Sequence, residues 1–290
     1  MRQDLIHWLT TLAPLAKYPP ASWRITRLGG LGNRNYRLRN GHADLMLRLP
    51  GAGTEQLVDR AAEIHNVELA AQLGLCPPLL HGDDHGVQLF RYLGDARPLT
   101  GRDCREPAML ERIGTLLARL HGSGMVFRGR VDLDGTLERY WRLASPLPPE
   151  VEALLAATAP LRRHLADTRK ALAPCHLDPH PGNFLITAGG RLYLVDWEYS
   201  AMGEPLWDLA TLAGEAALDG ENTAMLLDAH GRLPDRASLR RLTLYRGLLA
   251  LLALLWWYVH HPGQRQAAYP RERWRRARCL LGWEVADRQP

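Results

Sequence analysis

Short runs of alternating apolar and polar residues, separated by glycine-rich turns, open the chain. Three such runs lie at residues 23–28, 34–40 and 45–50, with GGLGN and GHAD between them. This is the pattern of three antiparallel strands joined by tight turns. Apolar residues then recur at helical spacing over residues 57–71, and two more strand-like runs follow at residues 78–81 and 87–92. The first 93 residues are therefore predicted to form a small β-rich lobe with one helix.

Beyond residue 94, helical spacing replaces the strand pattern. It begins with Met109, Ile113, Leu116 and Leu120. One stretch interrupts it, where a loop rich in His, Asp, Pro and Gly leads into two strand-like runs, NFLIT and RLYLVDW, with the turn AGG between them. The chain is therefore predicted to be an α+β protein with two lobes, a small one at residues 1–93 and a larger, mainly helical one at residues 94–290.

Composition narrows the class of protein. The 290 residues are 46% hydrophobic and 23% charged, as in ordinary globular proteins, and the net charge is +5. Most basic residues are arginines; five gather near the C-terminus without the aromatic pattern of a nucleic-acid site, so we expect no nucleic acid. The four cysteines lack the spacing of a zinc or redox motif, which indicates reduced thiols. The most apolar stretch, residues 247–259, is too short to cross a bilayer, so we expect a cytoplasmic protein with no membrane insertion.

The interrupting stretch carries the candidate chemistry. Its sequence, CHLDPHPGNFLITAGGRLYLVDWEYS, places Asp178 in the loop, Asn183 at the start of the first strand and Asp196 at the end of the second. A hairpin brings Asn183 and Asp196 close together. Phosphoryl transfer from ATP uses such a set, with one carboxylate to orient the acceptor hydroxyl and an amide and a second carboxylate to hold Mg²⁺ against the phosphates. His176 and His180 lack a third ligand for a metal site of their own, so His176 is interpreted as a residue that braces the loop.

Four segments carry a family resemblance: GGLGNRNYRL, LRLPGAGTEQLVDRAAEIHNVEL, HLDPHPGNF and RLYLVDWEYSAMGEPLWDLATL. Through them the chain resembles the aminoglycoside phosphotransferase and choline kinase superfamily, and within it the bacterial choline kinases, with thiamine kinases as near relatives. The resemblance runs from about Leu28 to Trp274. It implies a protein-kinase-like bilobal fold and an ATP-dependent small-molecule kinase. A protein kinase is disfavoured, because the metal motif is Asp-Trp-Glu rather than Asp-Phe-Gly and no Ala-Pro-Glu segment follows.

The resemblance also implies roles for single residues. By position, Asp178 is the catalytic base, and Asn183 and Asp196 bind Mg²⁺. The nucleotide-binding residues that it implies are Gly29, Gly30, Gly32, Asn33 and Asn35 in the loop over the phosphates, Arg48 as the phosphate-binding cation and Glu63 as the partner of that cation. Glycines suit such a loop because backbone N–H groups can then approach an anion closely. Many relatives carry lysine in place of Arg48 and threonine in place of Gly32, and Glu68 is the alternative partner for Arg48.

Aromatic residues indicate the class of acceptor. The chain has nine Trp and nine Tyr but three Phe, and several of them follow the catalytic loop. An aromatic cage with a nearby carboxylate holds a quaternary ammonium by cation–π attraction. The predicted acceptor-binding residues are Glu198, Tyr199, Trp207, Trp257 and Tyr258, with Glu204 as a second source of the carboxylate. The expected partner is a small-molecule substrate, a cationic alcohol, with choline as the leading candidate.

Other functions stay open at this point. Thiamine is also a cationic primary alcohol and would use a similar cage, and ethanolamine, an amino sugar or an aminoglycoside are further alternatives. A pseudokinase that binds nucleotide without chemistry is the alternative outside the enzymes. The presence of Asp178, Asn183 and Asp196 together argues against it.

Overall fold

The computed structural model describes residues 2–29, 33–51, 58–168 and 171–283. They divide into two compact units: a β-rich unit of residues 1–99 and 182–200, and a helical unit of residues 100–181 and 201–290. The sequence predicted a single boundary near residue 93. In the structure, the hairpin that carries Asn183 and Asp196 groups with the β-rich unit, although it is far from that unit in sequence.

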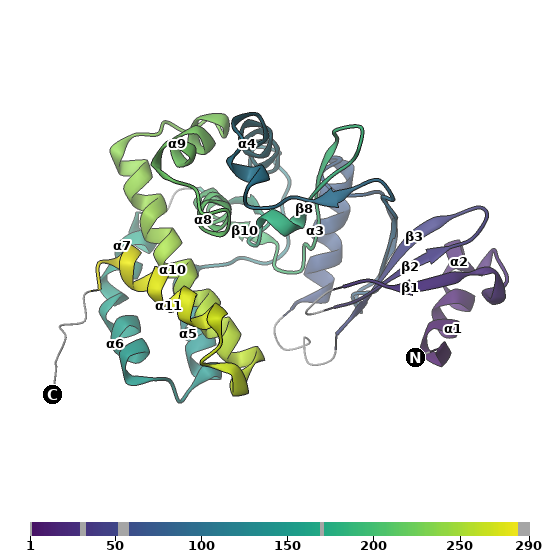
Figure 1. The fold of residues 1–290 in the computed structure, drawn as a ribbon, viewed down its shortest axis with the longest axis horizontal. Coiled ribbons are helices and arrows are strands. Elements are labelled where there is room, and N and C mark those ends of the chain that lie inside the picture. The colour runs from purple at the N-terminus through teal and green to yellow at the C-terminus, as the bar shows by residue number, and fades with distance from the viewer. Residues whose placement is uncertain (1, 30–32, 52–57, 169–170, 284–290) are drawn as a thin grey trace. The chain divides into compact units, whose positions relative to one another are not determined.

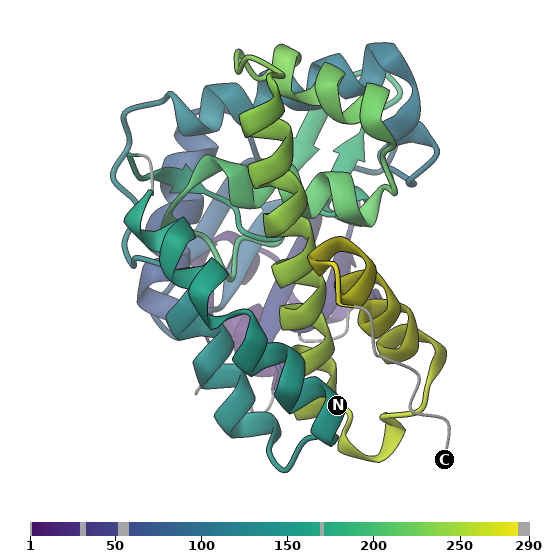
Figure 2. The same cartoon turned by 90° about the vertical axis from the view of Figure 1, so that its left-hand side faces the viewer.

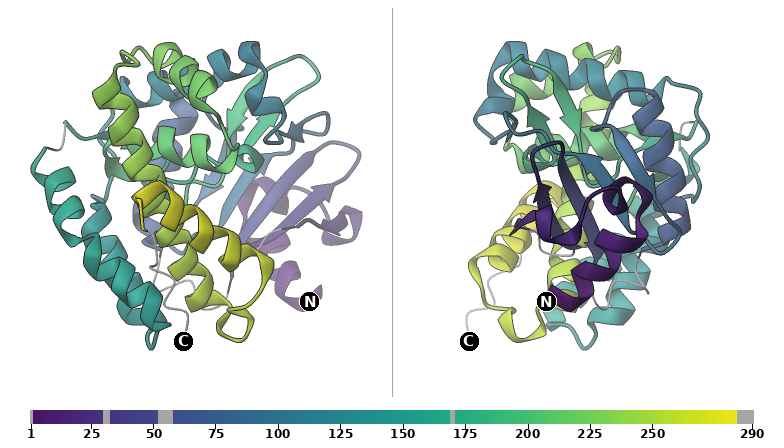
Figure 3. Two further views of the ribbon diagram at one scale, coloured as in Figure 1. Left: turned by 60° about the vertical axis from the view of Figure 1, so that its left-hand side comes forward. Right: turned by 90° about the vertical axis from the view of Figure 1, so that its right-hand side faces the viewer.

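A five-stranded antiparallel sheet forms the centre of the β-rich unit (Figure 1). Its strands are β1 (Arg24–Arg27), β2 (Asn33–Arg39), β3 (Asp44–Pro50), β4 (Leu79–Gly82) and β5 (Gln88–Arg91), in the spatial order β1-β2-β3-β5-β4. The five predicted strands are thereby confirmed. Two short helices, α1 (Arg2–Thr11) and α2 (Ala13–Ala16), pack on this sheet (Figure 3, right) and bury their leucines against Trp23, Leu38 and Leu47.

Helix α3 (Arg60–Gln72) lies between β3 and β4 in the chain and carries a buried acidic residue. Asp59 caps its N-terminus, because Asp59 Oδ1 accepts a hydrogen bond from the N–H of Ala62 at 3.0 Å. Glu63, in the first turn, is buried. Farther along, Asn66 Nδ2 donates to the carbonyl oxygen of Ser200 at 2.8 Å, which ties α3 to the turn that follows Asp196.

A second, three-stranded sheet in this unit holds the predicted hairpin. Its strands are β6 (Arg97–Pro98), β8 (Phe184–Ile186) and β9 (Leu192–Leu194), in the order β6-β8-β9. The two runs NFLIT and RLYLVDW are therefore paired strands, as predicted. Trp197, just past β9, is fully buried and donates from Nε1 to the carbonyl oxygen of Leu194 at 3.0 Å. This buried indole fixes the end of the hairpin.

Eight helices and one small strand pair make up the described part of the helical unit. They are α4 (Pro107–His121), α5 (Leu133–Ala144), α6 (Pro149–Ala157), α7 (Ala159–Asp167), α8 (Pro205–Glu215), α9 (Gly220–Ala229), α10 (Arg236–His260), α11 (Ala268–Leu281), β7 (Ala173–Cys175) and β10 (Ala201–Gly203). Within this unit, 3₁₀ turns lie at Asp103–Arg105 and Pro262–Gln264; a third lies at Pro20–Ser22 in the β-rich unit, and a fourth, Pro181–Asn183, lies at the boundary of the two units. The protein-kinase-like α+β fold predicted from the sequence is confirmed by these elements and by the solved structures compared below.

Helix α10 is the central helix of this unit (Figure 2) and contacts α5, α8 and α11. By length and apolar composition it could cross a membrane, the one helix within the described ranges that could, yet half of its most apolar window is buried inside the protein. Gly247 lets α11 approach closely, because a Cβ at that position would lie 2.8 Å from the side chain of Leu281. Such burial is what a core helix shows, as the sequence predicted for residues 247–259.

Candidate active site

A buried arginine on the sheet pairs with a buried glutamate on α3. Arg48 lies near the end of β3, opposite Asn35 of β2 and Gln88 of β5, and forms an ion pair with Glu63. Gln88 Nε2 donates to the same carboxylate at 2.8 Å. Arg48 is 6% exposed and Glu63 1%. Of the two candidate partners, Glu63 is therefore the one that pairs with Arg48, and Glu68 is exposed on α3.

The second terminal nitrogen of Arg48 reaches the Asp-Trp-Glu segment. Arg48 Nη2 donates to Asp196 Oδ1 at 2.7 Å and to Glu198 Oε2 at 3.1 Å. Glu198 Oε2 also accepts from Asn33 Nδ2 at 2.9 Å, and Arg60 Nη1 lies 3.5 Å from that oxygen. Arg48 can bind Glu63 on one side and Asp196 and Glu198 on the other because its two terminal nitrogens point in different directions. A lysine has a single ammonium.

The hairpin of β8 and β9 sets the spacing of the predicted metal ligands. Phe184 pairs with Leu194, and the carbonyl oxygen of Asn183 accepts from the N–H of Val195 at 2.9 Å. Asn183 therefore lies opposite the residue that precedes Asp196. The backbone of Asp196 is left-handed, with φ 69°, and 43% of its side chain is exposed. The hairpin thus brings the two residues together, as their pattern predicted, and leaves Asp196 accessible.

Glu198 adds a second carboxylate beside Asp196. Burial raises the pKa of Glu198, and the charge of Asp196 raises it further against the opposing charge of Arg48. Two carboxylates held this close favour a cation beside them. Oxygen atoms of carboxylates and amides are the ligands that Mg²⁺ prefers, so Asp196, Glu198 and Asn183 have the donor chemistry to hold it. The sequence assigned Glu198 to the acceptor; the contacts described above all lie within the β-rich unit, and a role in acceptor binding stays a prediction.

The predicted phosphate loop is described at its two ends. Gly30 and Gly32 lie outside the described residues. The N–H of Leu28 donates to the carbonyl oxygen of Asn35 at 2.8 Å, and Asn35 Nδ2 donates to the carbonyl oxygen of Gly29 at 3.1 Å. The loop therefore leaves β1 and enters β2 at paired positions, and its contact with phosphates stays a prediction.

In the helical unit, Asp178 lies in a tightly held loop after β7. Leu177 has a left-handed backbone, with φ 69°, and its carbonyl oxygen accepts from Trp207 Nε1 at 3.0 Å. The N–H of Asp178 donates to His176 Nδ1 at 3.3 Å, and its carbonyl oxygen accepts from the N–H of His180 at 2.9 Å. His176 thus braces the loop, as predicted. The carboxylate of Asp178 is 37% exposed and so is accessible to a substrate.

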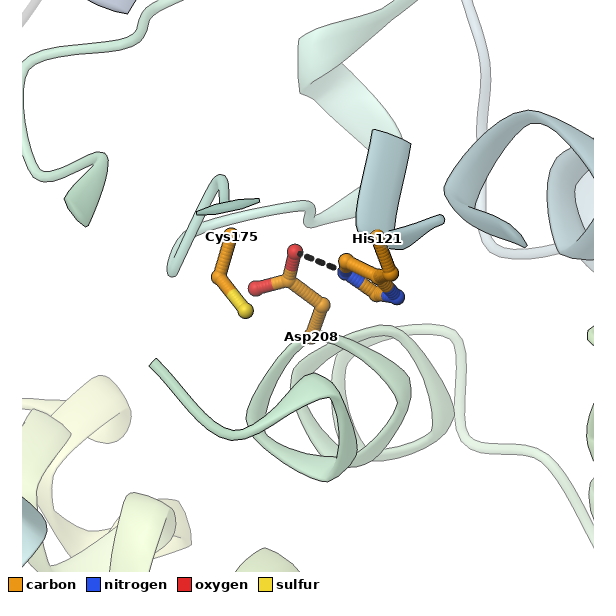
Figure 4. A group of neighbouring side chains, drawn as sticks. All are labelled: His121, Cys175 and Asp208. Carbon is orange, nitrogen blue, oxygen red and sulfur yellow. Dashed lines mark hydrogen bonds and ion pairs between the residues drawn. The ribbon is translucent and has the colours of Figure 1, made fainter. Parts of the chain in front are cut away.

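A buried aspartate on α8, Asp208, holds this loop through hydrogen bonds to its backbone (Figure 4). Asp208 Oδ1 accepts from the N–H of Leu177 at 2.7 Å, and Asp208 Oδ2 accepts from the N–H of His176 at 2.8 Å. His121 Nε2 donates to Asp208 Oδ2 at 3.0 Å. Asp208 is in the first turn of α8, where the helix dipole favours a negative charge. Sequence reasoning missed this residue, although an aspartate inside the apolar run EPLWDLATL is a signal of a buried hydrogen-bond network.

His121, Cys175 and Asp208 also have the ligand types of a metal site, with their ligand atoms within 4.8 Å of one another. The contacts argue for a hydrogen-bond network instead, because both oxygens of Asp208 are already used by backbone N–H groups. His121 Nδ1 lies 2.7 Å from His230 Nε2, so a neutral His121 that donates to Asp208 accepts from His230. Burial lowers the pKa of His230 to about 3, with the help of His121. Burial and the charge of Asp208 hold the pKa of Cys175 well above its usual value, so its thiol is protonated.

Comparison with known proteins agrees with this geometry. Residues 24–245 match the model of the phosphotransferase enzyme family. The chain belongs to that family. Protein LicA of Haemophilus influenzae is 29% identical over 242 residues, which cover 79% of this chain and 71% of that protein. A choline/ethanolamine kinase family protein from Mesorhizobium loti is 32% identical, covers 99% of this chain and 96% of its own, and has a TM-score of 0.81. Choline kinase LicA from Streptococcus pneumoniae is 26% identical, covers 98% and 99%, and has a TM-score of 0.83.

Membership in the phosphotransferase family fixes the reaction class. The predicted resemblance is confirmed, and the protein is an ATP-dependent small-molecule kinase. The roles of single residues are a separate matter. The base, the nucleotide-binding residues and the metal ligands named above stay predictions that the geometry can accommodate.

In this phosphotransferase the predicted acceptor residues of the helical unit lie in different surroundings. Trp207 and Glu204 line a cavity of about 30 Å³, which has room for one or two water molecules rather than for choline. Glu204 is buried and accepts from Arg241 and from the hydroxyl of Tyr245. Tyr258 is buried, with the guanidinium of Arg265 over its ring at 5.0 Å. Tyr199 belongs to the β-rich unit.

Trp257 is the predicted acceptor residue with the most suitable neighbours. It is partly exposed, and its ring centroid lies 4.8 Å from that of Tyr269 on α11. Burial raises the pKa of the Tyr269 hydroxyl, and the charges of Glu215 and Asp178 raise it further against that of Arg273. Tyr269 is linked to Glu215 through Arg273, whose guanidinium lies over the Tyr269 ring and donates to Glu215 Oε2. Tyr269 is one of the aromatic residues that follow the catalytic segment in the sequence. Sequence reasoning missed Glu215 and Arg273, which no local pattern distinguishes from other helix-surface charges.

Proposed function

We propose that this kinase transfers the γ-phosphoryl group of ATP to the hydroxyl of a small cationic alcohol, with choline as the first candidate, and that Mg²⁺ assists. The observation that carries the proposal is the contact of Trp257 with Tyr269, 4.8 Å between ring centroids, in the unit that also holds Asp178. Paired aromatic rings of this kind attract an alkylammonium group, and Asp178 supplies a carboxylate for the hydroxyl. The names of the relatives, choline kinase and choline/ethanolamine kinase, support the same acceptor class.

The chemistry assigns one task to each group. Asp178 accepts the proton of the acceptor hydroxyl as its oxygen attacks the γ-phosphorus; the new O–P bond forms, the bond from that phosphorus to the bridging oxygen of ADP breaks, and ADP leaves. Arg48 holds the phosphates of the nucleotide. Asn183 and Asp196, joined by Glu198, would hold Mg²⁺, and the ion would neutralise charge on the phosphates.

The contacts of Arg48 bear on how it could bind phosphates. In the structure it binds Asp196 and Glu198, the carboxylates proposed for the metal. Glu63 would keep two partners if Arg48 turned to the phosphates, because Arg60 Nη1 donates to it at 2.6 Å and Gln88 at 2.8 Å. The ion-pair network therefore supports exchange of carboxylates for phosphates at Arg48 without an unpaired charge at Glu63.

The test is ATP turnover by the purified protein with choline, ethanolamine, thiamine and kanamycin, with and without Mg²⁺. The proposal predicts Mg²⁺-dependent ADP release in which choline has the highest kcat/KM. A higher kcat/KM for thiamine would support a cationic alcohol as the acceptor class but would replace choline as the acceptor. A higher value for kanamycin would contradict the acceptor class. Nucleotide binding without turnover of any alcohol would favour the pseudokinase.

A further inference from the structure

Arg273 on α11 forms a two-point ion pair with Glu215 at the end of α8. Arg273 Nη2 donates to Glu215 Oε2 at 2.6 Å, and Nη1 donates to the other oxygen, Oε1. Arg273 is 8% exposed, whereas the side chain of Glu215 is 28% exposed. Each oxygen of the Glu215 carboxylate is therefore engaged by the same guanidinium.

The guanidinium also lies over the ring of Tyr269, 4.5 Å from its centroid. Arg273 thus connects the two features of the candidate acceptor site, the carboxylate and the aromatic ring. Arg276 is a second cation near Glu215, at 4.0 Å, and it donates to the carbonyl oxygen of Gly214 at 2.6 Å. Arg273 is therefore the close cationic partner of Glu215, and Arg276 is a more distant one.

This pairing has different consequences for different alkylammonium groups. A primary ammonium brings three N–H donors, which lose water on entry and require acceptors of their own. A quaternary ammonium has no donors and needs only low-polarity contact and negative potential, which the rings and Asp178 supply. Pairing of Glu215 with Arg273 therefore costs little for the binding of a quaternary ammonium. It weakens the binding of a primary ammonium, because that group loses an acceptor for its N–H donors.

We propose that Arg273 determines acceptor selectivity: by occupying Glu215 it withholds that carboxylate from primary ammonium groups, so that the kinase prefers a quaternary ammonium alcohol. This inference rests on the proposed function, a cationic alcohol as acceptor. It makes Arg273 a specificity-determining residue that acts through Glu215, with no part in the phosphoryl transfer itself.

The experiment compares kcat/KM for choline and for ethanolamine in the full-length protein and in variants. Arg273→Met, which keeps an apolar side chain of similar length over Tyr269, frees Glu215 and should change the choline-to-ethanolamine ratio by about tenfold or more in favour of ethanolamine, since a hydrogen bond to a charged group is worth at least that factor. The double variant Arg273→Met with Glu215→Gln should return the ratio to that of the wild type. A purely structural role would not be reversed by the second substitution.

Two further variants complete the design. Arg275→Met removes a charge from the same helix, but Arg275 is exposed and pairs with Glu272, so its ratio should equal that of the wild type. Arg273→Lys keeps the charge and cannot engage both oxygens, so it should shift the ratio in the same direction but less; if Arg273→Met does not fold, this variant carries the test.

The result separates the two claims. Turnover of choline with a ratio unchanged in Arg273→Met, or a shift that survives Glu215→Gln, overturns the role of Arg273 and leaves the proposed function intact. Absence of turnover with both alcohols in the wild type overturns the proposed function and this inference with it.

Discussion

His230 should make the stability of the helical unit depend on pH. Its Nε2 lies 2.7 Å from His121 Nδ1, and His121 in turn donates to Asp208. Asp208 accepts the backbone hydrogen bonds that hold the loop of Asp178. The pKa of His230 is about 3 in the folded protein, against 6.5 for a free histidine. As pH falls below 6.5, the unfolded chain takes up a proton at this residue and the folded chain does not. The stability present above pH 6.5 is therefore lost progressively down to about pH 3.

The size of this loss follows from the two pKa values. Between pH 7 and pH 5, one histidine with this difference removes about 2 kcal/mol from the free energy of unfolding. His230→Gln should remove that contribution, because glutamine does not titrate and its side-chain amide can still donate to His121. The variant should therefore lose about 2 kcal/mol less than the wild type over the same range.

Urea unfolding at pH 5, 6 and 7, followed by circular dichroism, measures the difference. His85→Gln is the matched control, because the His85 imidazole is exposed in the turn between β4 and β5. In this variant the free energy of unfolding should change with pH as it does in the wild type. If the free energy of unfolding changed equally with pH in the wild type and in His230→Gln, the reasoning would be refuted. That result would mean that His230 is protonated alike in the folded and unfolded states.

Three further substitutions test the proposed roles. Asp178→Asn should lower kcat by about 10² or more while the affinity for ATP is kept, because positioning of a general base is worth about 10² to 10⁴; near-wild-type kcat would remove Asp178 from the mechanism. Asp196→Ala should abolish the Mg²⁺-dependent part of ATP binding, which calorimetry measures, and unchanged Mg·ATP affinity would refute the metal assignment. Trp257→Leu should raise the KM for choline about tenfold and leave the KM for ATP unchanged; a change in the KM for ATP alone would place Trp257 elsewhere.

Local patterns predicted the strands and the reaction class because both depend on residues that are close together in the sequence. The alternation in residues 34–50 gave β2 and β3, and with them the position of Arg48 on the third strand. The spacing from Asn183 to Asp196 required a hairpin, and the structure pairs those strands. Glu63 and Arg48 meet because one helical turn after Asp59 faces the sheet.

Contacts between distant segments could not be predicted in the same way. Asp208 meets the loop at His176 from about thirty residues away, and nothing in the spacing specifies that approach. The pair of Glu215 and Arg273 joins two helices 58 residues apart in sequence. The sequence shows how many aromatic residues there are, but not which of them a substrate can reach, because that depends on burial. Tyr258 is buried with Arg265 over its ring, whereas Trp257 stays partly exposed.

The central claim is phosphoryl transfer to the hydroxyl of choline, and the product itself tests it most directly. We would incubate the purified protein with ATP, Mg²⁺ and choline and follow the reaction by ³¹P NMR. The account predicts a new phosphomonoester signal that grows in step with ADP and is absent without choline. Formation of ADP with inorganic phosphate alone, at a rate that choline does not change, would contradict it.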